Sequence, residues 1–316
     1  MRRLRLGHAI AVFAAFALLA GGTTTVSARP ATGWGLDRID QRALPLDATY
    51  SPPADGTGVT VYLIDTGLDT SNAQFSGRAS LGANFTNRPD GDCADEMGVG
   101  HGTFVAGIAG GDETGVANNV TLVEVQAITC AEGGSSMTAA QERRAVVKAA
   151  RWIRLNAVRP AVVNMSLAFR PPHSVDRAVQ KLIDSGIPVV AAAGNEGENA
   201  CQRSPARVPA VITVGASTQT DRAWRGSNQG SCIDLFAPGK DITSVLMDGG
   251  VLQYEFVGAT SWAAPFVAGA AAIFLQSNPT ATPAQVARVL RRSATTGALR
   301  GVRSGTPNRL LYVGDL

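Results

Sequence analysis

Residues 59–67 read Val-Thr-Val-Tyr-Leu-Ile-Asp-Thr-Gly, an apolar run that ends in an acidic residue and a glycine corner. The run is continuous rather than alternating, which is typical of a strand in a sheet with both faces covered. Further runs of strand length recur along the chain, at Leu122–Ile128, Ala161–Met165, Ile187–Ala193, Val211–Val214 and Ile233–Phe236. Together they predict the buried strands of a mostly parallel sheet.

Helical patterns with clear start signals lie between these runs. Capping boxes begin two of them at Thr138 and Thr282, and a third begins at Ser174 and stops at Gly186. Strands that alternate with helices imply parallel pairing through right-handed crossovers. The predicted fold is therefore α/β, a three-layer doubly wound arrangement around a mostly parallel central sheet. In such folds, sites form outside the carboxyl ends of the strands.

The first 28 residues have the features of a signal peptide. Three arginines open the chain, an apolar run follows over Ala9–Ala20, and Val26-Ser27-Ala28 offers small residues for cleavage. No later segment is long and apolar enough to span a bilayer. We expect a secreted, extracellular, monomeric protein with no membrane association after cleavage. Residues 29–316 are expected to form a single domain, with no evident pro-segment before it.

The charge balance argues against a nucleic-acid partner. The chain has 28 Lys and Arg against 25 Asp and Glu, and removing the three arginines of the leader leaves 25 of each sign. The four cysteines, Cys93, Cys130, Cys201 and Cys232, follow an export signal, so disulfides are favoured over metal thiolates. None has C-x-x-C spacing, and the sequence leaves three pairings open.

Three short segments supply an acid, a base and a hydroxyl. Asp65 follows the first apolar run, His101 lies between two glycines before a small-residue helix, and Ser261 begins an Ala- and Gly-rich helix. These are the groups that acyl transfer needs: a nucleophile, a base for its proton and a carboxylate to hold the base. Of the other histidines, His8 leaves with the signal and His173 is expected in a polar surface loop.

Asn195 adds an amide donor at the end of the fourth run, suited to stabilising an oxyanion. Each residue alone also has a structural explanation, as a turn aspartate, a turn asparagine, a helix cap or a backbone-bonded histidine. Asp65-Thr66-Gly67 also matches the aspartic protease signature, but those enzymes need two such carboxylates and no second copy occurs. A metal-dependent hydrolase is disfavoured, because no H-E-x-x-H cluster is present.

The segments resemble the subtilisin-like serine proteases, most closely their proteinase K and aqualysin-type branch. The match extends from Trp34-Gly-Leu-Asp-Arg-Ile to Ser304-Gly-Thr-Pro-Asn-Arg-Leu-Leu. The resemblance implies that Asp65 orients His101, that His101 is general base and then acid, and that Ser261 is the nucleophile. Asn195 and the Ser261 amide would form the oxyanion hole.

The resemblance also implies a cleft in which a polypeptide substrate adds as an extended strand. The residues implied to contact the substrate come from three segments, namely Gly134 and Ser135, then Ser166, Leu167 and Ala168, then Ala192 and Gly194. The pairings Cys93–Cys130 and Cys201–Cys232 are implied in the same way. No cofactor is implied for the chemistry, but a structural Ca²⁺ site is, with the carbonyls of Pro209 and Val211 and the carboxylate of Asp234.

Several residues depart from the family pattern near the implied cleft. Ala168 and Phe169 replace two glycines, Trp262 replaces the methionine after the serine, and Ala259 and Phe266 replace a glycine and a histidine. The leading hypothesis is a secreted serine endopeptidase that acts through an acyl-enzyme. The alternative is a catalytically impaired peptide-binding protein with the same fold, in which these departures spoil the cleft.

Overall fold

A computed structural model describes residues 26–93, 99–130, 137–171 and 173–316. The predicted signal peptide lies almost entirely outside the described residues. Within the described ranges, no helix combines the length and apolar character needed to cross a bilayer.

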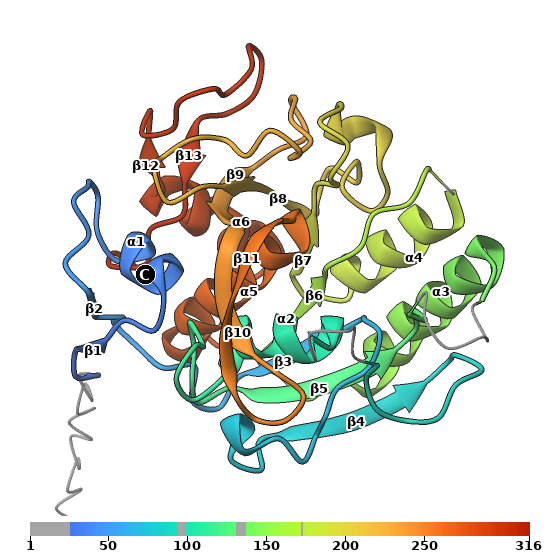
Figure 1. The fold of residues 1–316 in the computed structure, drawn as a ribbon. Helices are drawn as coiled ribbons and strands as arrows, with labels where there is room; N and C mark the ends of the chain where they lie inside the picture. Colours follow the sequence, from blue (N-terminus) through green and yellow to red (C-terminus); the bar gives the residue numbers. More distant parts are fainter. Residues whose placement is uncertain (1–25, 94–98, 131–136, 172) are drawn as a thin grey trace, which may run out of the picture.

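The core of the fold is a nine-stranded sheet with helices on both faces (Figure 1). The strand order is β12-β13-β9-β8-β7-β6-β3-β5-β4, and every pairing is parallel except that of β12 with β13. The strands are β3 (Thr60–Leu63), β4 (Ala79–Asn84), β5 (Thr121–Gln126), β6 (Ala161–Met165), β7 (Val189–Ala192), β8 (Ile212–Ser217), β9 (Leu235–Pro238), β12 (Thr295–Thr296) and β13 (Arg309–Leu310). The predicted α/β class and mostly parallel sheet are confirmed.

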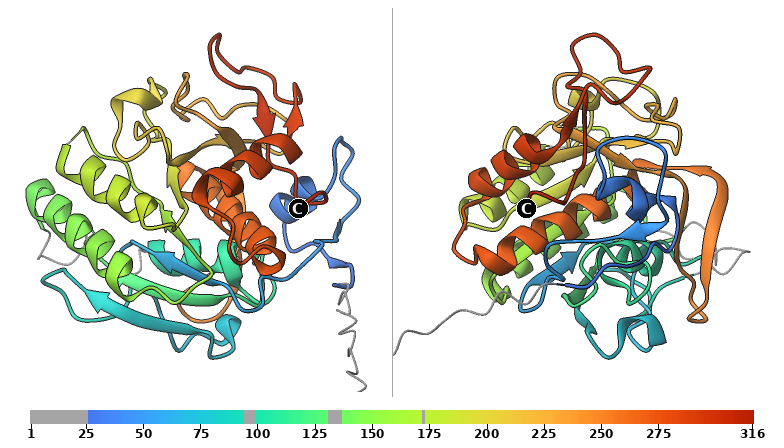
Figure 2. Two further views of the ribbon diagram at one scale, coloured as in Figure 1. Left: turned by 180° about the vertical axis from the view of Figure 1, so that it is seen from behind. Right: turned by 90° about the vertical axis from the view of Figure 1, so that its left-hand side faces the viewer.

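The helices bury the two faces of this sheet in separate cores. Figures 1 and 2 show α3 and α4 side by side on one face, and α2, α5 and α6 on the other. Neighbouring residues of a strand point to opposite faces, so Tyr62 lies in the α3–α4 core while Leu63 lies in the α2–α5 core. The helices are α1 (Trp34–Ile39), α2 (His101–Gly110), α3 (Ala139–Asn156), α4 (His173–Asp184), α5 (Thr260–Ser277) and α6 (Pro283–Ser293), with short 3₁₀ helices η1 (Ala73–Phe75) and η2 (Ala200–Gln202).

Most element starts follow the signals in the sequence. Thr138 and Thr282 each cap a helix through complete capping boxes. The helix expected from Ser174 begins one residue earlier, so His173 lies at the start of α4 rather than in a loop.

Several elements were not predicted. The strand β4 forms an edge of the sheet, where its side chains are only half-buried and give no continuous apolar run. A separate antiparallel hairpin joins β10 (Lys240–Val245) to β11 (Val251–Gly258) and stands away from the central sheet (Figure 2). A further two-stranded pair, β1 (Arg29–Pro30) and β2 (Thr49–Tyr50), lies near the start of the described chain.

Candidate active site

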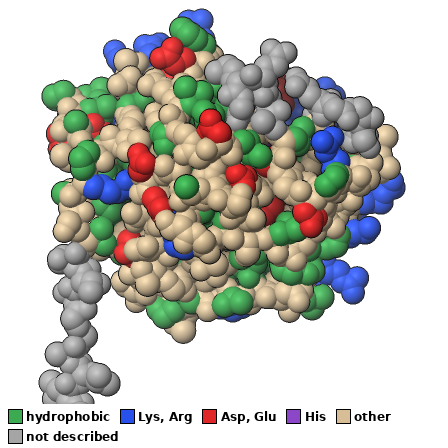
Figure 3. Space-filling view, turned by 60° about the horizontal axis from the view of Figure 1, so that its bottom comes forward, with side chains coloured by type: hydrophobic (Ala, Val, Ile, Leu, Met, Phe, Trp, Pro, Cys, Tyr) green, Lys and Arg blue, Asp and Glu red, His purple; other side chains and the backbone are tan. Residues whose placement is uncertain are grey.

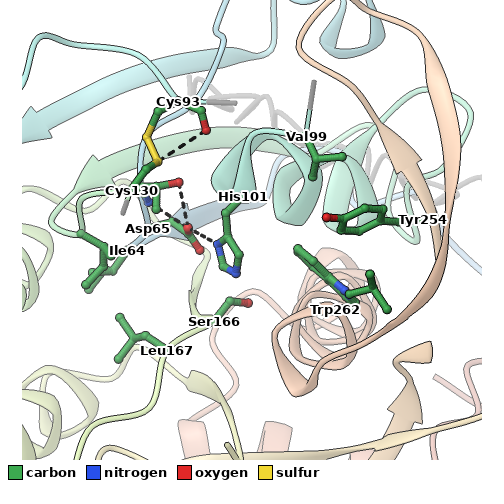
Figure 4. Close-up of a pocket in the computed structure, with 13 residues that line it drawn as sticks. Ile64, Asp65, Cys93, Val99, His101, Cys130, Ser166, Leu167, Tyr254 and Trp262 are labelled. Atoms are coloured by element: carbon green, nitrogen blue, oxygen red, sulfur yellow. Dashed lines mark hydrogen bonds and ion pairs between the residues drawn. A yellow bond between two sulfur atoms is a disulfide. The ribbon is translucent and has the colours of Figure 1, made fainter. Parts of the chain in front are cut away.

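Asp65 and His101 form a direct hydrogen-bonded pair. Asp65 lies two residues beyond β3 and His101 is the first residue of α2, and 2.6 Å separates Asp65 Oδ1 from His101 Nδ1. The same Asp65 oxygen accepts the backbone N–H of Thr66 at 2.8 Å. The carboxylate is 2 % exposed, whereas a third of the His101 side chain is exposed. The ring therefore receives its orientation from a buried carboxylate and faces a cavity with its other nitrogen (Figure 4).

The pair depends on a very close approach of two backbone segments. A Cβ atom placed on Gly102 would lie 2.0 Å from the carbonyl oxygen of Gly67, so only glycine fits at this contact. The backbone N–H of Gly102 also donates to Thr66 Oγ1 at 3.0 Å. The glycine after the histidine thus allows the start of α2 to dock against the turn that carries Asp65.

Charges near the ring control its protonation. Burial of the ring lowers the pKa of His101, but the negative charge of Asp65, the hydrogen bond to it and the charge of Asp92 outweigh that effect and raise the pKa. Asp92 is held near the ring because its carboxylate accepts from Thr66 Oγ1 at 2.7 Å and from the Thr103 N–H at 2.7 Å.

Ser261 is the second residue of α5 and is fixed by two reciprocal bonds to Ser166. The Ser261 hydroxyl donates to the carbonyl of Ser166 at 3.1 Å, and the Ser166 hydroxyl donates to the carbonyl of Ser261 at 2.8 Å. Pro265, four residues along the helix, has no N–H for that carbonyl, which leaves it free to accept from Ser166. The end of β6 therefore holds the start of α5.

Asn195 lies beside the same helix start. Its Oδ1 accepts from the backbone N–H and from the hydroxyl of Thr260, both at 2.8 Å. These bonds assign the oxygen of the amide and leave the NH₂ group as the remaining donor. No acceptor among the described residues binds that NH₂ group, and the side chain is exposed.

A largely apolar cavity of about 480 Å³ adjoins His101 (Figure 4). The Trp262 ring forms part of its wall, 5.1 Å from the His101 ring and 4.6 Å from Phe104. The lining residues are Ile64, Asp65, Thr66, Cys93, Val99, His101, Ile128, Cys130, Ser166, Leu167, Tyr254, Val257 and Trp262. Among the residues that depart from the family pattern, Trp262 is the one that lines this cavity.

Only some of the residues implied to bind substrate line this cavity. Ser166 and Leu167 line the cavity, whereas Ala192 and Gly194 are buried and do not. Ala168 is absent from the lining as well, and its neighbour Phe169 pairs instead with Ser204 through two backbone bonds of 2.8 and 3.0 Å. Gly134 and Ser135 lie outside the described residues.

The four cysteines form two disulfides. Cys93 is bonded to Cys130 and Cys201 to Cys232, with Cα–Cα distances of 6.3 and 5.3 Å. These are the pairs that the resemblance implies. The first bond lies in the cavity wall, where it joins the loop before α2 to the loop after β5.

Asp234, the charged donor implied for calcium, already has a cationic partner in this structure. Ca²⁺ takes six to eight oxygen ligands, of which Asp234 would supply the charged one. Both Asp234 oxygens already accept hydrogen bonds, Oδ1 from Arg291 Nη1 at 2.8 Å and Oδ2 from the Thr213 N–H at 2.9 Å. Arg291 therefore supplies the positive charge beside Asp234.

On the face of the molecule shown in Figure 3, most acidic side chains lie toward the middle, and several Lys and Arg side chains lie along the right-hand edge.

Comparison with known proteins identifies the family. The model of the Subtilase family matches residues 56–310, which include the Asp65–His101 pair, Asn195 and Ser261. The chain belongs to the subtilase family. It is 46% identical over 279 residues to "Alkaline serine exoprotease A" of Vibrio alginolyticus, an alignment that spans 88% of this chain and 50% of that protein.

Two further relatives agree with this membership. "Extracellular serine proteinase" of Thermus sp. (strain Rt41A) is 46% identical over 283 residues, 90% of this chain and 66% of that protein. The solved structure titled "Crystal structure of a cold adapted subtilisin-like serine proteinase" superposes with a TM-score of 0.81 at 44% identity, covering 90% of this chain and 99% of that one. The chain spans between half and two thirds of the length of these two curated subtilases.

Sequence reasoning missed two acidic residues beside the pair. Asp92 occurs in an acidic stretch to which the sequence analysis assigned no role, yet its half-buried carboxylate accepts hydrogen bonds from Thr66 and Thr103, and burial raises its pKa. Glu124 is a single acid within an apolar run that was interpreted only as a strand. A charged residue in a run expected to be buried on both faces was the available signal.

We predict that Asp234→Asn lowers the melting temperature by the same amount in a chelator and in added calcium. The reason is that the variant loses the ion pair with Arg291, which needs no metal. Thermal unfolding of wild type and variant under both conditions measures this, and Arg291→Met serves as the matched variant for the other partner. A loss confined to calcium-containing buffer would contradict the assignment.

Proposed function

We propose that this subtilase is a secreted serine endopeptidase that hydrolyses polypeptides through an acyl-enzyme. The observation that carries the proposal is the 2.6 Å hydrogen bond from the His101 ring to buried Asp65, with the opposite ring edge facing the cavity. A histidine held in this way by a carboxylate is oriented as a general base. The names of its extracellular proteinase relatives support the same assignment.

In the proposed reaction, His101 Nε2 takes the proton of Ser261 as Oγ attacks the substrate carbonyl. The Ser261 hydroxyl donates to the Ser166 carbonyl in the free protein. Rotation about the Cα–Cβ bond would turn it toward the imidazole, and catalytic hydrogen bonds often align only when substrate binds. Asp65 then stabilises the imidazolium, which returns its proton to the leaving amine.

The oxyanion would be held by two donors at the start of α5. One is the NH₂ group of Asn195, whose orientation is fixed because its oxygen is bound twice by Thr260. The other is the backbone N–H of Ser261, where the helix dipole also favours negative charge. An extended peptide would pair with the backbone at Ser166 and Leu167, and the apolar lining suits apolar side chains.

The alternative, a peptide-binding subtilase without turnover, is favoured by one observation. The Ser261 hydroxyl donates to Ser166 rather than to His101 in the free protein. The reactivity of Ser261 decides between the two functions.

Replacing the nucleophile tests the proposal directly. Ser261→Ala should abolish both cleavage of an internally quenched peptide with blocked ends and labelling by a fluorophosphonate probe. Blocked ends restrict the assay to internal bonds. Ser277→Ala, an exposed serine at the far end of the same helix, is the control and should leave both readouts intact. Cleavage by Ser261→Ala equal to wild type would overturn the proposal, and a wild type that binds peptide without labelling would establish the alternative.

The oxyanion role predicts a loss of kcat without a matching change in KM. Removing one such donor costs roughly 10²- to 10³-fold in kcat. We expect this loss for Asn195→Ala, and also for Asn195→Asp, which keeps the oxygen that Thr260 binds but lacks the NH₂ donor. Steady-state kinetics measures it, with the melting temperature as a check on folding. Wild-type kcat in Asn195→Asp would exclude the donor role.

The raised pKa of His101 sets the acidic limit of activity. The base must be neutral, so kcat/KM should fall as pH drops through the pKa of the free enzyme. Because Asp65 and Asp92 raise that pKa, the midpoint should lie above about 6.5, the ordinary value for histidine. A pH profile of kcat/KM with an uncharged substrate measures the midpoint, and a value below the ordinary one would contradict the assignment.

A further inference from the structure

Glu124 is a buried acid that the proposed reaction does not use. It lies on β5 with none of its surface exposed, and neither carboxyl oxygen has a hydrogen bond of standard length and angle among the described residues. Leaving a buried polar atom unpaired is costly, and an unpaired buried charge costs far more. We therefore expect the Glu124 carboxyl either to have a hydrogen-bond partner or to be protonated and uncharged.

One carboxylate oxygen of Asp65 is also buried and unpaired. Asp65 Oδ1 accepts from His101 and Thr66, but Oδ2 is buried without a hydrogen-bond partner. The two acids are close neighbours, because Leu63 of β3 is paired in register with Glu124. The N–H groups of Asp65 and Gly67 also face the Glu124 carboxyl.

The chain after Glu124 wraps around Asp65. The backbone N–H groups of Ala127 and Ile128 both donate to the carbonyl of Asp65, at 3.0 and 3.1 Å. These two hydrogen bonds fix the segment that follows β5 against the turn that carries Asp65. The backbone segments that carry the two carboxyl groups therefore cannot separate without breaking these bonds.

The elements around Glu124 supply more negative than positive charge. The turn after β3 supplies Asp65, the loop before α2 supplies Asp92, and α2 supplies His101 as its one titratable residue. The strand β4 on the other edge of β5 has no titratable side chain. Adjacent buried carboxylates do not all ionise together. Asp65 accepts two hydrogen bonds of standard geometry, whereas Glu124 has only the N–H groups of Asp65 and Gly67 facing it outside that geometry, so we assign the proton to Glu124.

We propose that Glu124 is a positioning residue whose protonated carboxyl donates a hydrogen bond to Oδ2 of Asp65. Asp65 would then be held at both oxygens, by His101 and Thr66 on one side and by Glu124 on the other. This inference rests on the proposed function of Asp65 and His101. A neutral donor fixes the carboxylate without adding a second negative charge beside the imidazole.

The electrostatics agree with this geometry. Burial raises the pKa of Glu124, and the charges of Asp65 and Asp92 raise it further, well above the usual range for glutamate. This direction favours the neutral carboxyl group that a hydrogen bond to Asp65 requires.

Two measurements that need no enzymatic activity test the proton on Glu124. An infrared difference spectrum of wild type minus Glu124→Gln at neutral pH should contain the C=O stretch of a protonated carboxylic acid. The pKa of His101, followed by NMR, should be unchanged in Glu124→Gln, because a neutral group replaces a neutral group. His173 is the other histidine after the leader, so His173→Asn assigns the signals. A missing C=O band, or a His101 pKa lowered in Glu124→Gln, would show an ionised Glu124 and overturn the proposal.

Kinetics then tests the donor. Glu124→Met has a similar size but no donor, and hydrogen bonds to charged groups are strong enough that kcat should fall about tenfold. KM should stay the same, and Glu124→Gln, whose amide donates, should recover most of the loss. Wild-type kcat in Glu124→Met, in a variant with normal thermal unfolding, would exclude the role. Labelling of Ser261 by the fluorophosphonate probe reports separately on whether the proposed function itself holds.

Discussion

The contact between Gly102 and Gly67 is the constraint on which the site depends. Two backbone segments meet there without any side chain between them, and this brings the first residue of α2 within hydrogen-bond distance of the carboxylate after β3. A methyl group at Gly102 would push the helix start away and lengthen the Asp65–His101 bond. The packing of α2 and α5 on one face of the sheet then places Ser261 and Asn195 near the same rim.

The start of α5 shows how a local irregularity serves the site. Proline within a helix removes one backbone donor, which normally weakens the helix. Here the freed carbonyl belongs to Ser261 and accepts from Ser166 instead, so the missing bond is replaced by one to the end of β6. Asn164 donates to the same Ser166 hydroxyl at 2.9 Å. Ser261, the proposed nucleophile, is thus positioned by the sheet as well as by its own helix.

Much of this architecture could be predicted from the sequence, because continuous apolar runs and capping boxes are local signals. The run at Ala161–Met165 coincides with β6, and the boxes at Thr138 and Thr282 begin α3 and α6. The strand β4 was missed because an edge strand buries little and so need not be apolar. Glu124 was missed for another reason. Its neighbours Asp65 and Asp92 are distant in sequence. The pairing of β3 with β5 brings Asp65 close to Glu124, and hydrogen bonds to Thr66 and Thr103 bring Asp92 there as well.

The disulfide bond between Cys93 and Cys130 joins the loop before His101 to the loop after β5, the strand that carries Glu124. Both cysteines line the cavity. This disulfide in the cavity wall forms only in an oxidising environment. In the reducing conditions of the cytosol the two loops would be joined by no covalent bond. The rigidity of the cavity wall beside His101 therefore depends on the redox conditions around the protein.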